Sequence, residues 1–388
     1  MAEHSSTLKR RKLDIDRVHI NLSQRELQRY ILEIAKEPVV FLDKISDWKS
    51  LSWTPETLAK QLSNARTRFR FCPRISSSQY RFPAKHAVME TDCQFVEGTF
   101  KDFYKWLTCT EENSQDLVFK KFPRKDYSCY ADYKYMKDLF AECPNKLHDI
   151  NWSSLGFPSR TGEQSTFWMG SVESFTPCHY DSYGCNLVAQ LYGRKKWLLF
   201  SPTQSDCLYP TRVPYEESSV FSPVNFRDPD HDKFPKFENA TCYEVILEPG
   251  DVLFVPKHWW HYVECLETAI SVNTWIEMHT DNYDRIEEAI TRSLIYPLKS
   301  QEAKVDALHS ELWLNPSMKE EDLSFPASMQ YLRQALKQYH LEQMKVNQVA
   351  EPTESDKLSE DDFIKTVVSP DVVRIIAKKL VELTKATP

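Results

Sequence analysis

The chain has 388 residues, of which 41% are hydrophobic and 13% aromatic, enough for one large domain with extensions and an ample core. Its formal net charge of −7 argues against a protein that binds DNA or RNA along its surface. The ten cysteines include no Cys-x-x-Cys pair, and no signal peptide or membrane-spanning run is recognisable. These features favour a cytoplasmic protein with reduced thiols and no membrane association, and they leave a nuclear location open.

The first 125 residues alternate helix and strand signals. Residues 1–20 are a polar tail whose basic cluster, residues 9–12, is either a nuclear-import signal or a solvated segment. Ser23 and Glu26 form a capping box ahead of apolar residues at helical spacing, and Pro38 ends this helix. We therefore expect an N-terminal α/β lead-in over residues 21–125 that packs on the core. Its further predicted elements are a strand at 39–42, a helix at 54–62, a strand at 67–72 and a helix at 100–107.

Between residues 126 and 280 the pattern changes to short strands separated by turns. Six of the seven glycines lie between residues 151 and 250, where tight turns are therefore concentrated. This pattern predicts a mainly β core, a sandwich or barrel of the jelly-roll kind. Proline-rich residues 202–240 predict a long irregular insertion, which we interpret as a lid on the substrate side.

After residue 280 the sequence predicts helices. Residues 281–348 carry apolar positions at helical spacing and would stabilise the core or a homodimer. Residues 349–368 have the acidic composition of a disordered linker. Residues 369–388 begin with Ser-Pro-Asp, a strong helix start, and predict an amphipathic helix that docks on its own domain or on a partner.

Candidate metal ligands come from one of four His-x-Asp/Glu pairs, a spacing that is not specific by itself. Only His179 and Asp181 lie between predicted strands, and only they are followed by a histidine, His261, that ends a later apolar strand. Two imidazoles and one carboxylate can bind Fe(II) on one face and leave the opposite positions open. We predict these three residues as ligands; the alternative is that they are buried polar residues of the core. The other pairs are better explained by predicted helices or helix starts: His279/Asp281, His309/Glu311 and His340/Glu342.

A turn at Gly193 and Arg194 predicts which of three neighbouring cations faces the interior. Glycine at the first central position is typical of a type II′ hairpin, in which the flanking strands 186–192 and 195–200 would pair. Alternation along the strands then places Lys195 on the same face as Asn186. Lys196 would point to the other face, and Arg194 would lie in the exposed turn.

Several motifs resemble those of a known family. They are HYD at residues 179–181, NLVAQLYGRKKW at 186–197, LYP at 208–210, and PGDVLFVP followed by WWH, which ends at residue 261. Over residues 130–276 these runs resemble a JmjC domain. Within that family the sequence is similar to the asparaginyl hydroxylase that inhibits hypoxia-inducible factor, and more so to a cytoplasmic branch named for its association with small heat-shock proteins.

The resemblance implies a double-stranded β-helix that binds Fe(II) and uses 2-oxoglutarate and dioxygen as cosubstrates. It assigns the ligand role directly after the two tryptophans to His261, and not to His258. It also implies that Lys195 pairs with the far carboxylate of 2-oxoglutarate. The cosubstrate pocket would be completed by Tyr130, Thr176, Asn186 and Asn273.

We therefore hypothesise an Fe(II)- and 2-oxoglutarate-dependent oxygenase, most consistent with a protein hydroxylase that acts in the stress response through small heat-shock proteins. The first alternative is a non-catalytic scaffold that binds small heat-shock proteins. The second is a tRNA hydroxylase, which the acidic net charge disfavours. The hydroxylated substrate and the oligomeric state stay open.

Overall fold

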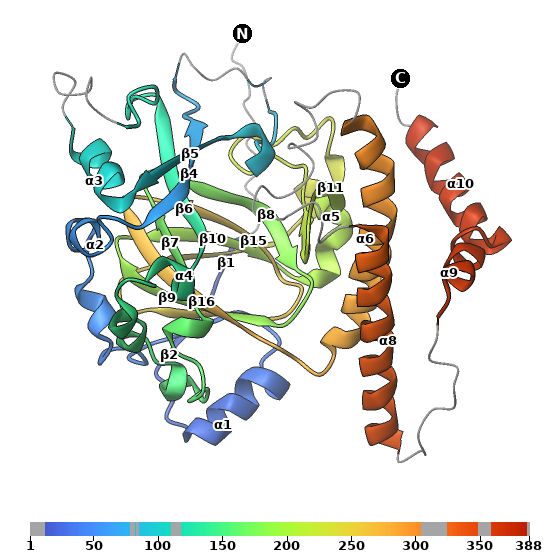
Figure 1. Ribbon diagram of the computed structural model, residues 1–388, viewed down its shortest axis with the longest axis horizontal. Helices are drawn as coiled ribbons and strands as arrows, with labels where there is room; N and C mark the ends of the chain where they lie inside the picture. Colours follow the sequence, from blue (N-terminus) through green and yellow to red (C-terminus); the bar gives the residue numbers. More distant parts are fainter. Residues whose placement is uncertain are drawn as a thin grey trace, which may run out of the picture. The chain divides into compact units, whose positions relative to one another are not determined.

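The computed structural model describes residues 12–77, 82, 85–109, 118–303, 324–347 and 358–385 (Figure 1). Most of the basic cluster at residues 9–12 and the His309/Glu311 pair lie outside these residues. The chain divides into two compact units, which meet in the sequence after Met278. None of the described helices is long and apolar enough to cross a membrane.

The first unit is built on two β-sheets. A seven-stranded sheet has the order β1-β13-β10-β15-β8-β12-β11, and a nine-stranded sheet has the order β2-β3-β14-β9-β16-β7-β6-β4-β5. This confirms the predicted mainly β fold class. The strands of the seven-stranded sheet are β1 (Lys12–Asp14), β8 (Phe175–Asp181), β10 (Lys195–Phe200), β11 (Thr211–Glu216), β12 (Ser219–Phe221), β13 (Cys242–Leu247) and β15 (Trp260–Cys265). Those of the nine-stranded sheet are β2 (Asp16–Val18), β3 (Val39–Phe41), β4 (Arg66–Pro73), β5 (Gln94–Thr99), β6 (Tyr127–Tyr135), β7 (Thr166–Gly170), β9 (Cys185–Tyr192), β14 (Val252–Val255) and β16 (Ala269–Ile276).

The N-terminal helices pack on the nine-stranded sheet. They are α1 (Gln24–Arg29), α2 (Pro55–Gln61) and α3 (Phe100–Thr108), and each begins with a capping box, formed by Ser23, Thr54 and Thr99. Phe167 on β7 stacks edge-on against Phe100 and lies near Trp53, so this face of the sheet is covered by the helices. Because side chains alternate along a strand, the next residue, Trp168, faces the opposite side, toward the interior between the sheets.

Apolar side chains from both sheets meet in that interior. Val188 and Leu253 come from the nine-stranded sheet, and Trp197 and Val263 from the seven-stranded sheet. All four side chains are buried, and burying each contributes roughly 1.5–3 kcal/mol to folding. This contact holds the inner faces of the two sheets together around the polar residues described below.

The predicted hairpin between residues 186–192 and 195–200 is wrong. Strand β9 pairs with β14 and β16, whereas β10 pairs with β13 and β15, so the two strands lie in different sheets. Gly193, with φ +60°, and Arg194 make the turn that crosses from one sheet to the other. A local turn signal does not distinguish this crossing from a hairpin. Asn186 and Lys195 nevertheless face the same space, because the inner faces of the sheets oppose each other.

The proline-rich insertion at 202–240 is more regular than predicted. It contains a short helix, α5 (Ser205–Leu208), and the antiparallel strands β11 and β12. Strand β12 pairs with β8, with Phe221 opposite His179 and Ser219 opposite Asp181. The prediction of an irregular insertion is therefore wrong at residues 211–221, because backbone pairing with β8 orders a segment whose composition alone suggests a loop.

The second unit is helical, as predicted. Its helices are α6 (Asp281–Ala303), α8 (Phe325–Asn347), α9 (Glu360–Val367) and α10 (Pro370–Lys385). Their shared core contains Ala289 and Leu332, together with Met329. Helix α6 begins at Asp281, which confirms the helix-start interpretation of that carboxylate.

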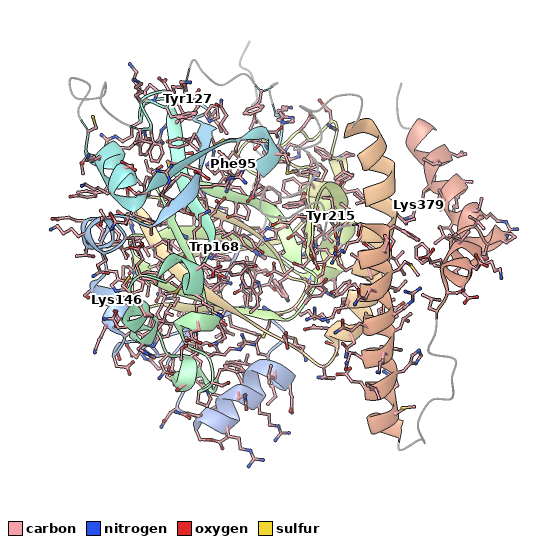
Figure 2. All side chains as sticks on the ribbon, viewed as in Figure 1. Phe95, Tyr127, Lys146, Trp168, Tyr215 and Lys379 are labelled. Atoms are coloured by element: carbon pink, nitrogen blue, oxygen red, sulfur yellow. The ribbon has the colours of Figure 1, made fainter. Side chains whose placement is uncertain are left out.

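Helix α9 lies inside the segment predicted as an acidic linker, 349–368, so that prediction is wrong at residues 360–367. Ser359 and Asp362 form a capping box, and Phe363 is only 7% exposed against Phe325. The acidic composition of the whole segment outweighs two local signals, the capping box and the single aromatic residue, so composition alone predicts a linker. In contrast, the apolar residues of α10 remain exposed along with its lysines, such as Lys379 (Figure 2). Val373, Ile376 and Leu380 are 47–57% exposed.

The crossing turn at Gly193 provides a test of the two-sheet arrangement. A Cβ at this position would lie 2.1 Å from the carbonyl oxygen of Thr268, in addition to the cost of a positive φ. We expect Gly193→Ala to lower the free energy of unfolding by about 2–4 kcal/mol, as measured by the midpoint of thermal unfolding. Gly250→Ala is the matched control, because Gly250 also has a positive φ but nothing within 4 Å of the added atom. Equal loss in the two variants would contradict the close approach at Gly193.

Candidate metal centre

Strands β8 and β15 bring two histidines and one aspartate together. His179 and His261 are direct cross-strand neighbours, with ring centroids 4.2 Å apart. Asp181 follows two residues later on β8, and its Oδ1 lies 3.8 Å from His179 Nε2. One candidate ligand atom from each residue lies within 4.8 Å of the other two. Within the described part of the chain this is the one such group of three or more His, Cys, Asp and Glu side chains.

Backbone and side-chain contacts orient all three residues. The Nδ1 of His179 lies 2.8 Å from the carbonyl oxygen of Pro177, and the Nδ1 of His261 lies 3.0 Å from that of Trp259. Because a carbonyl oxygen only accepts, each Nδ1 carries the proton and each Nε2 keeps its lone pair free. The remaining oxygen of Asp181, Oδ2, accepts a hydrogen bond from the indole of Trp275 at 2.9 Å.

The protonation state of the site suits a divalent metal ion. Burial, and then the neighbouring His179, lower the pKa of His261 to about 4, so its imidazole is neutral near pH 7. A metal ligand must be deprotonated, and two neutral imidazoles with one carboxylate are the donor set of an open-sided Fe(II) site. The chemistry of the three donors therefore fits the group that the sequence predicts.

His258 lies outside this group, as the sequence predicts. Its backbone has φ +63°, and its Nε2 lies 3.0 Å from the carbonyl oxygen of Ser182. Its ring packs beside Tyr180 at 5.3 Å, on the other side of β8 from the candidate ligands.

Two β-bulges place residues three positions apart on the same face. On β8 the register with β15 shifts by one residue between Thr176 and His179, so both side chains face the interior. On β6 a shift against β7 does the same for Tyr130 and Tyr133, and Tyr133 has φ +56°. Strict alternation along either strand would have turned one residue of each pair away.

Lys195 is a buried cation in the same pocket. It is 1% exposed, and its Nζ donates to Ser271 Oγ at 2.7 Å and to Tyr130 Oη at 3.2 Å. Burial lowers its pKa, and among the described residues no carboxylate lies close enough to its Nζ to form an ion pair. Within the described part of the chain, the ammonium group therefore has hydroxyl partners but no counter-charge.

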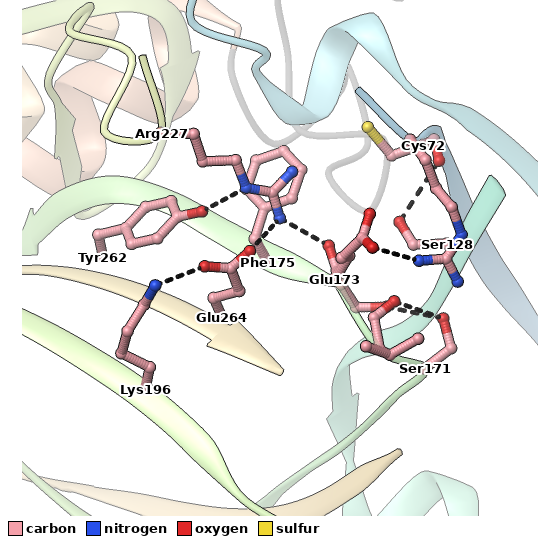
Figure 3. Close-up of polar contacts among 12 residues, drawn as sticks. Cys72, Ser128, Ser171, Glu173, Phe175, Lys196, Arg227, Tyr262 and Glu264 are labelled. Atoms are coloured by element: carbon pink, nitrogen blue, oxygen red, sulfur yellow. Dashed lines mark hydrogen bonds and ion pairs between the residues drawn. The ribbon is translucent and has the colours of Figure 1, made fainter. Parts of the chain in front are cut away.

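The two neighbouring cations point away from the pocket, as the sequence predicts, and each forms an ion pair. Lys196 contacts Glu264 at 2.9 Å, and Glu264 also contacts Arg227 at 2.7 Å (Figure 3). Arg194 contacts the exposed Glu267 at 2.9 Å. Of these three consecutive cations, only Lys195 points into the pocket.

One pocket between the sheets contains every residue that the sequence analysis selected. The three candidate ligands and Lys195 line it, together with Tyr130, Thr176, Asn186 and Asn273. Further residues that were not selected from the sequence also line the pocket, among them Tyr133, Trp168, Ser271 and Trp275. Strand alternation could have suggested Ser271 and Trp275, which share a face with Asn273 on β16, whereas the bulge at Tyr133 leaves no sequence signal.

A family model described as a cupin-like domain matches residues 24–282. The chain belongs to the cupin-like family. This match includes all strands from β3 to β16, and thus the whole pocket. The JmjC resemblance is supported by relatives that carry that domain in their names or are named as lysine-specific demethylases.

The cupin-like region and its flanks are similar to several curated proteins. The chain is 46% identical to a protein of Danio rerio named HSPB1-associated protein 1 homolog over 317 residues, which is 80% of this chain and 67% of the relative. It is 42% identical to human HSPB1-associated protein 1 over 304 residues, 78% of this chain and 60% of the relative. Lysine-specific demethylase 8 of Xenopus tropicalis is 35% identical over 149 residues, 37% of this chain and 32% of the relative. The chain thus spans about 60–67% of the HSPB1-associated relatives.

Metal binding tests the ligand group. We expect His261→Ala to weaken binding of Mn(II), a redox-stable substitute for Fe(II), by roughly 100-fold or more, because even supporting residues typically contribute 10- to 100-fold. Asp181→Ala should behave similarly, since it removes the anionic ligand. The control is His258→Asn, because asparagine tolerates the positive φ of that position. Calorimetric titration of the metal-free protein measures the affinities, and equal loss in the His258 and His261 variants would refute the assignment.

Proposed function

We propose that this cupin-like protein is an Fe(II)- and 2-oxoglutarate-dependent oxygenase that hydroxylates a protein substrate. The observation that carries the proposal is the buried ammonium group of Lys195, which has no carboxylate partner among the described residues and lies in the same pocket as the His-Asp-His group. A buried unpaired cation is costly, and an anionic ligand would compensate it. The presence of lysine-specific demethylases among the relatives supports an oxygenase class.

The spacing along the ladder supports a small dicarboxylate. Lys195 is opposite Cys265 on β15, and His261 lies four residues before Cys265 on that strand. The backbone positions of Lys195 and His261 are therefore separated by about 13 Å along the strand direction. The side chains of Lys195 and His261 both point into the pocket, which shortens the distance that a ligand must span. Trp197, Val263 and Thr176 lie opposite one another on the strands between these two positions and also line the pocket. Fe(II) held by the triad and 2-oxoglutarate held by the metal and Lys195 would together supply the oxidising chemistry, in which dioxygen converts 2-oxoglutarate to succinate and carbon dioxide and hydroxylates a substrate C–H bond.

The chain itself would bind, orient and exclude water. The imidazoles of His179 and His261 are held by backbone carbonyl groups, and their Nε2 atoms face the pocket. Trp197 stacks beside His261 at 5.8 Å, and Val188 and Val263 add apolar wall. Such a wall keeps bulk solvent from the reacting centre and strengthens the interaction of Lys195 with a carboxylate.

Cosubstrate binding and turnover test this proposal. We expect Lys195→Ala to weaken anaerobic binding of 2-oxoglutarate to the Fe(II)-loaded protein by about 30- to 150-fold, which corresponds to roughly 2–3 kcal/mol for a charge-assisted contact in a dry pocket. Lys196→Ala is the matched control, because this cation pairs with Glu264 outside the pocket. Calorimetry measures binding, and succinate release on exposure to air measures turnover. Failure of the wild-type protein to bind 2-oxoglutarate would refute the function.

A second candidate function is association with a small heat-shock protein, which could accompany the first or replace it. The relatives named HSPB1-associated protein 1 suggest this partner, and the exposed apolar residues of α10 offer a surface for it. Val373, Ile376 and Leu380 are spaced to lie along one side of the helix. Exposed aliphatic residues gathered on one helix are typical of a surface that a partner covers.

Removal of α10 separates the two functions. We expect truncation after residue 368 to abolish co-precipitation with a purified small heat-shock protein, while leaving 2-oxoglutarate binding by the first unit unchanged. The control is substitution of the exposed Lys378 and Lys379 by Ala in the full chain, which keeps the apolar residues. Unchanged co-precipitation after truncation would show that α10 is not the docking surface.

A further inference from the structure

Two tryptophans outside the predicted set each donate a hydrogen bond to a different part of the pocket. Trp168, on β7, donates from Nε1 to Asn273 Oδ1 at 2.7 Å. Trp275, on β16, donates from Nε1 to Asp181 Oδ2 at 2.9 Å. Tyr133 lies between the two indoles, with ring centroids 5.0 Å from Trp168 and 5.7 Å from Trp275. The aromatic wall therefore contacts both the metal side and the amide side of the site.

The contact of Trp168 fixes the orientation of two amides. An indole N–H can only donate, so the Asn273 atom that faces it must be the carbonyl oxygen. The amide nitrogen of Asn273 then donates to Asn186 Oδ1 at 2.9 Å. With its oxygen occupied, Asn186 must turn its own NH2 group away from Asn273. One unambiguous donor thus sets the direction of the whole chain of hydrogen bonds.

The NH2 group at the end of this chain is available to a ligand. Asn186 lines the pocket and is 6% exposed, and no acceptor for its nitrogen is found among the described residues. Two N–H donors of a buried amide favour an oxygen acceptor, above all an anionic one. Lys195 presents a second, positively charged donor to the same pocket.

We propose that Trp168 is a positioning residue for the anionic cosubstrate, because it holds Asn273 and thereby aims the NH2 group of Asn186 at a carboxylate or keto oxygen of 2-oxoglutarate. This inference rests on the proposed function. Trp168 itself donates to protein and not to the ligand, so its effect is transmitted through the two asparagines. Trp275 acts on the metal ligand Asp181 by the same kind of contact. Trp168 therefore affects cosubstrate binding, and Trp275 affects metal binding.

The experiment compares Trp168→Phe with Trp275→Phe, each of which removes an indole N–H and keeps an aromatic ring. Calorimetry on the whole chain measures the Kd of Mn(II), and then the Kd of 2-oxoglutarate for the Mn(II)-loaded protein, where no turnover occurs. We expect Trp168→Phe to weaken 2-oxoglutarate binding about 10-fold and to change Mn(II) binding less than twofold. Trp275→Phe should weaken Mn(II) binding by a similar factor, because the orientation of Asp181 is no longer fixed.

A double-mutant cycle shows whether Trp168 acts through Asn273. In an Asn273→Ala background, Trp168→Phe should have less than a twofold further effect on 2-oxoglutarate binding. Asn186→Asp keeps the shape of the side chain but replaces its donors with oxygen, so it should weaken 2-oxoglutarate binding at least as much as Trp168→Phe and leave the melting temperature within a few degrees. This variant tests the amide direction even if Trp168→Phe does not fold.

The outcomes separate this inference from the function on which it rests. If the wild-type protein does not bind 2-oxoglutarate, the proposed function and the positioning role of Trp168 are both refuted. If the wild type binds 2-oxoglutarate and Trp168→Phe binds it equally well, only the positioning role is overturned. The same holds if Trp168→Phe weakens 2-oxoglutarate binding by the same factor in the wild-type and Asn273→Ala backgrounds. Wild-type affinity in Asn186→Asp would show that the amide points its oxygen into the pocket, which also overturns it.

Discussion

The antiparallel pairing of β8 with β15 is the constraint on which the site depends. It places His179 opposite His261, and the bulge between Thr176 and His179 turns both of these β8 residues to the interior. A metal ion needs its ligands within a few ångströms, and a pair of directly opposed strand positions provides that distance without flexible loops. Removing the bulge would keep the strand pairing but would turn the side chains in one half of β8 to the opposite face of the sheet.

The pocket concentrates polar groups in a place that an apolar core would otherwise fill. Lys195, His179 and His261 are all buried, and the lowered pKa values of Lys195 and His261 reflect the cost of charging them there. The large apolar clusters around the pocket offset this cost, because they hold both sheets in register. A bound anion would lower the cost of burying the Lys195 ammonium group, because opposite charges compensate each other's burial.

A second layer of contacts supports the candidate ligands. Backbone carbonyl groups fix the histidine tautomers, and two tryptophans fix Asp181 and Asn273. Behind Tyr130, the buried Arg70 donates to the carbonyl oxygen of Phe175, which precedes Thr176 on β8. Apart from Trp259, which directly precedes β15, the residues that make these contacts lie on strands, so the candidate ligands are held by rigid elements.

The sequence by itself determined the local features of this protein. The capping box of Ser23 and Glu26, and Pro55 at a first helical position, predicted helix starts, because each signal acts within a few residues. Apolar runs bounded by turns predicted the strands, and the position of His179, Asp181 and His261 beside such runs selected the candidate ligands. The family resemblance selected the cosubstrate residues. What the sequence could not determine was which strands would pair. The turn at Gly193 is compatible with both a hairpin and a crossing, and only the opposed sheets decide between them.

The tertiary structure alone decided which other residues enter the pocket. Tyr133 reaches it because of a bulge, and Trp168 matters because its partner, Asn273, is 105 residues away in the chain. A bulge is one extra residue in a ladder and leaves no periodic signal, whereas a long-range hydrogen bond exists only after both strands have found their neighbours. The same limit applies to α9, whose single buried aromatic, Phe363, is recognisable as an anchor only beside Phe325. Local patterns specify elements, and the pairing of distant elements specifies the site.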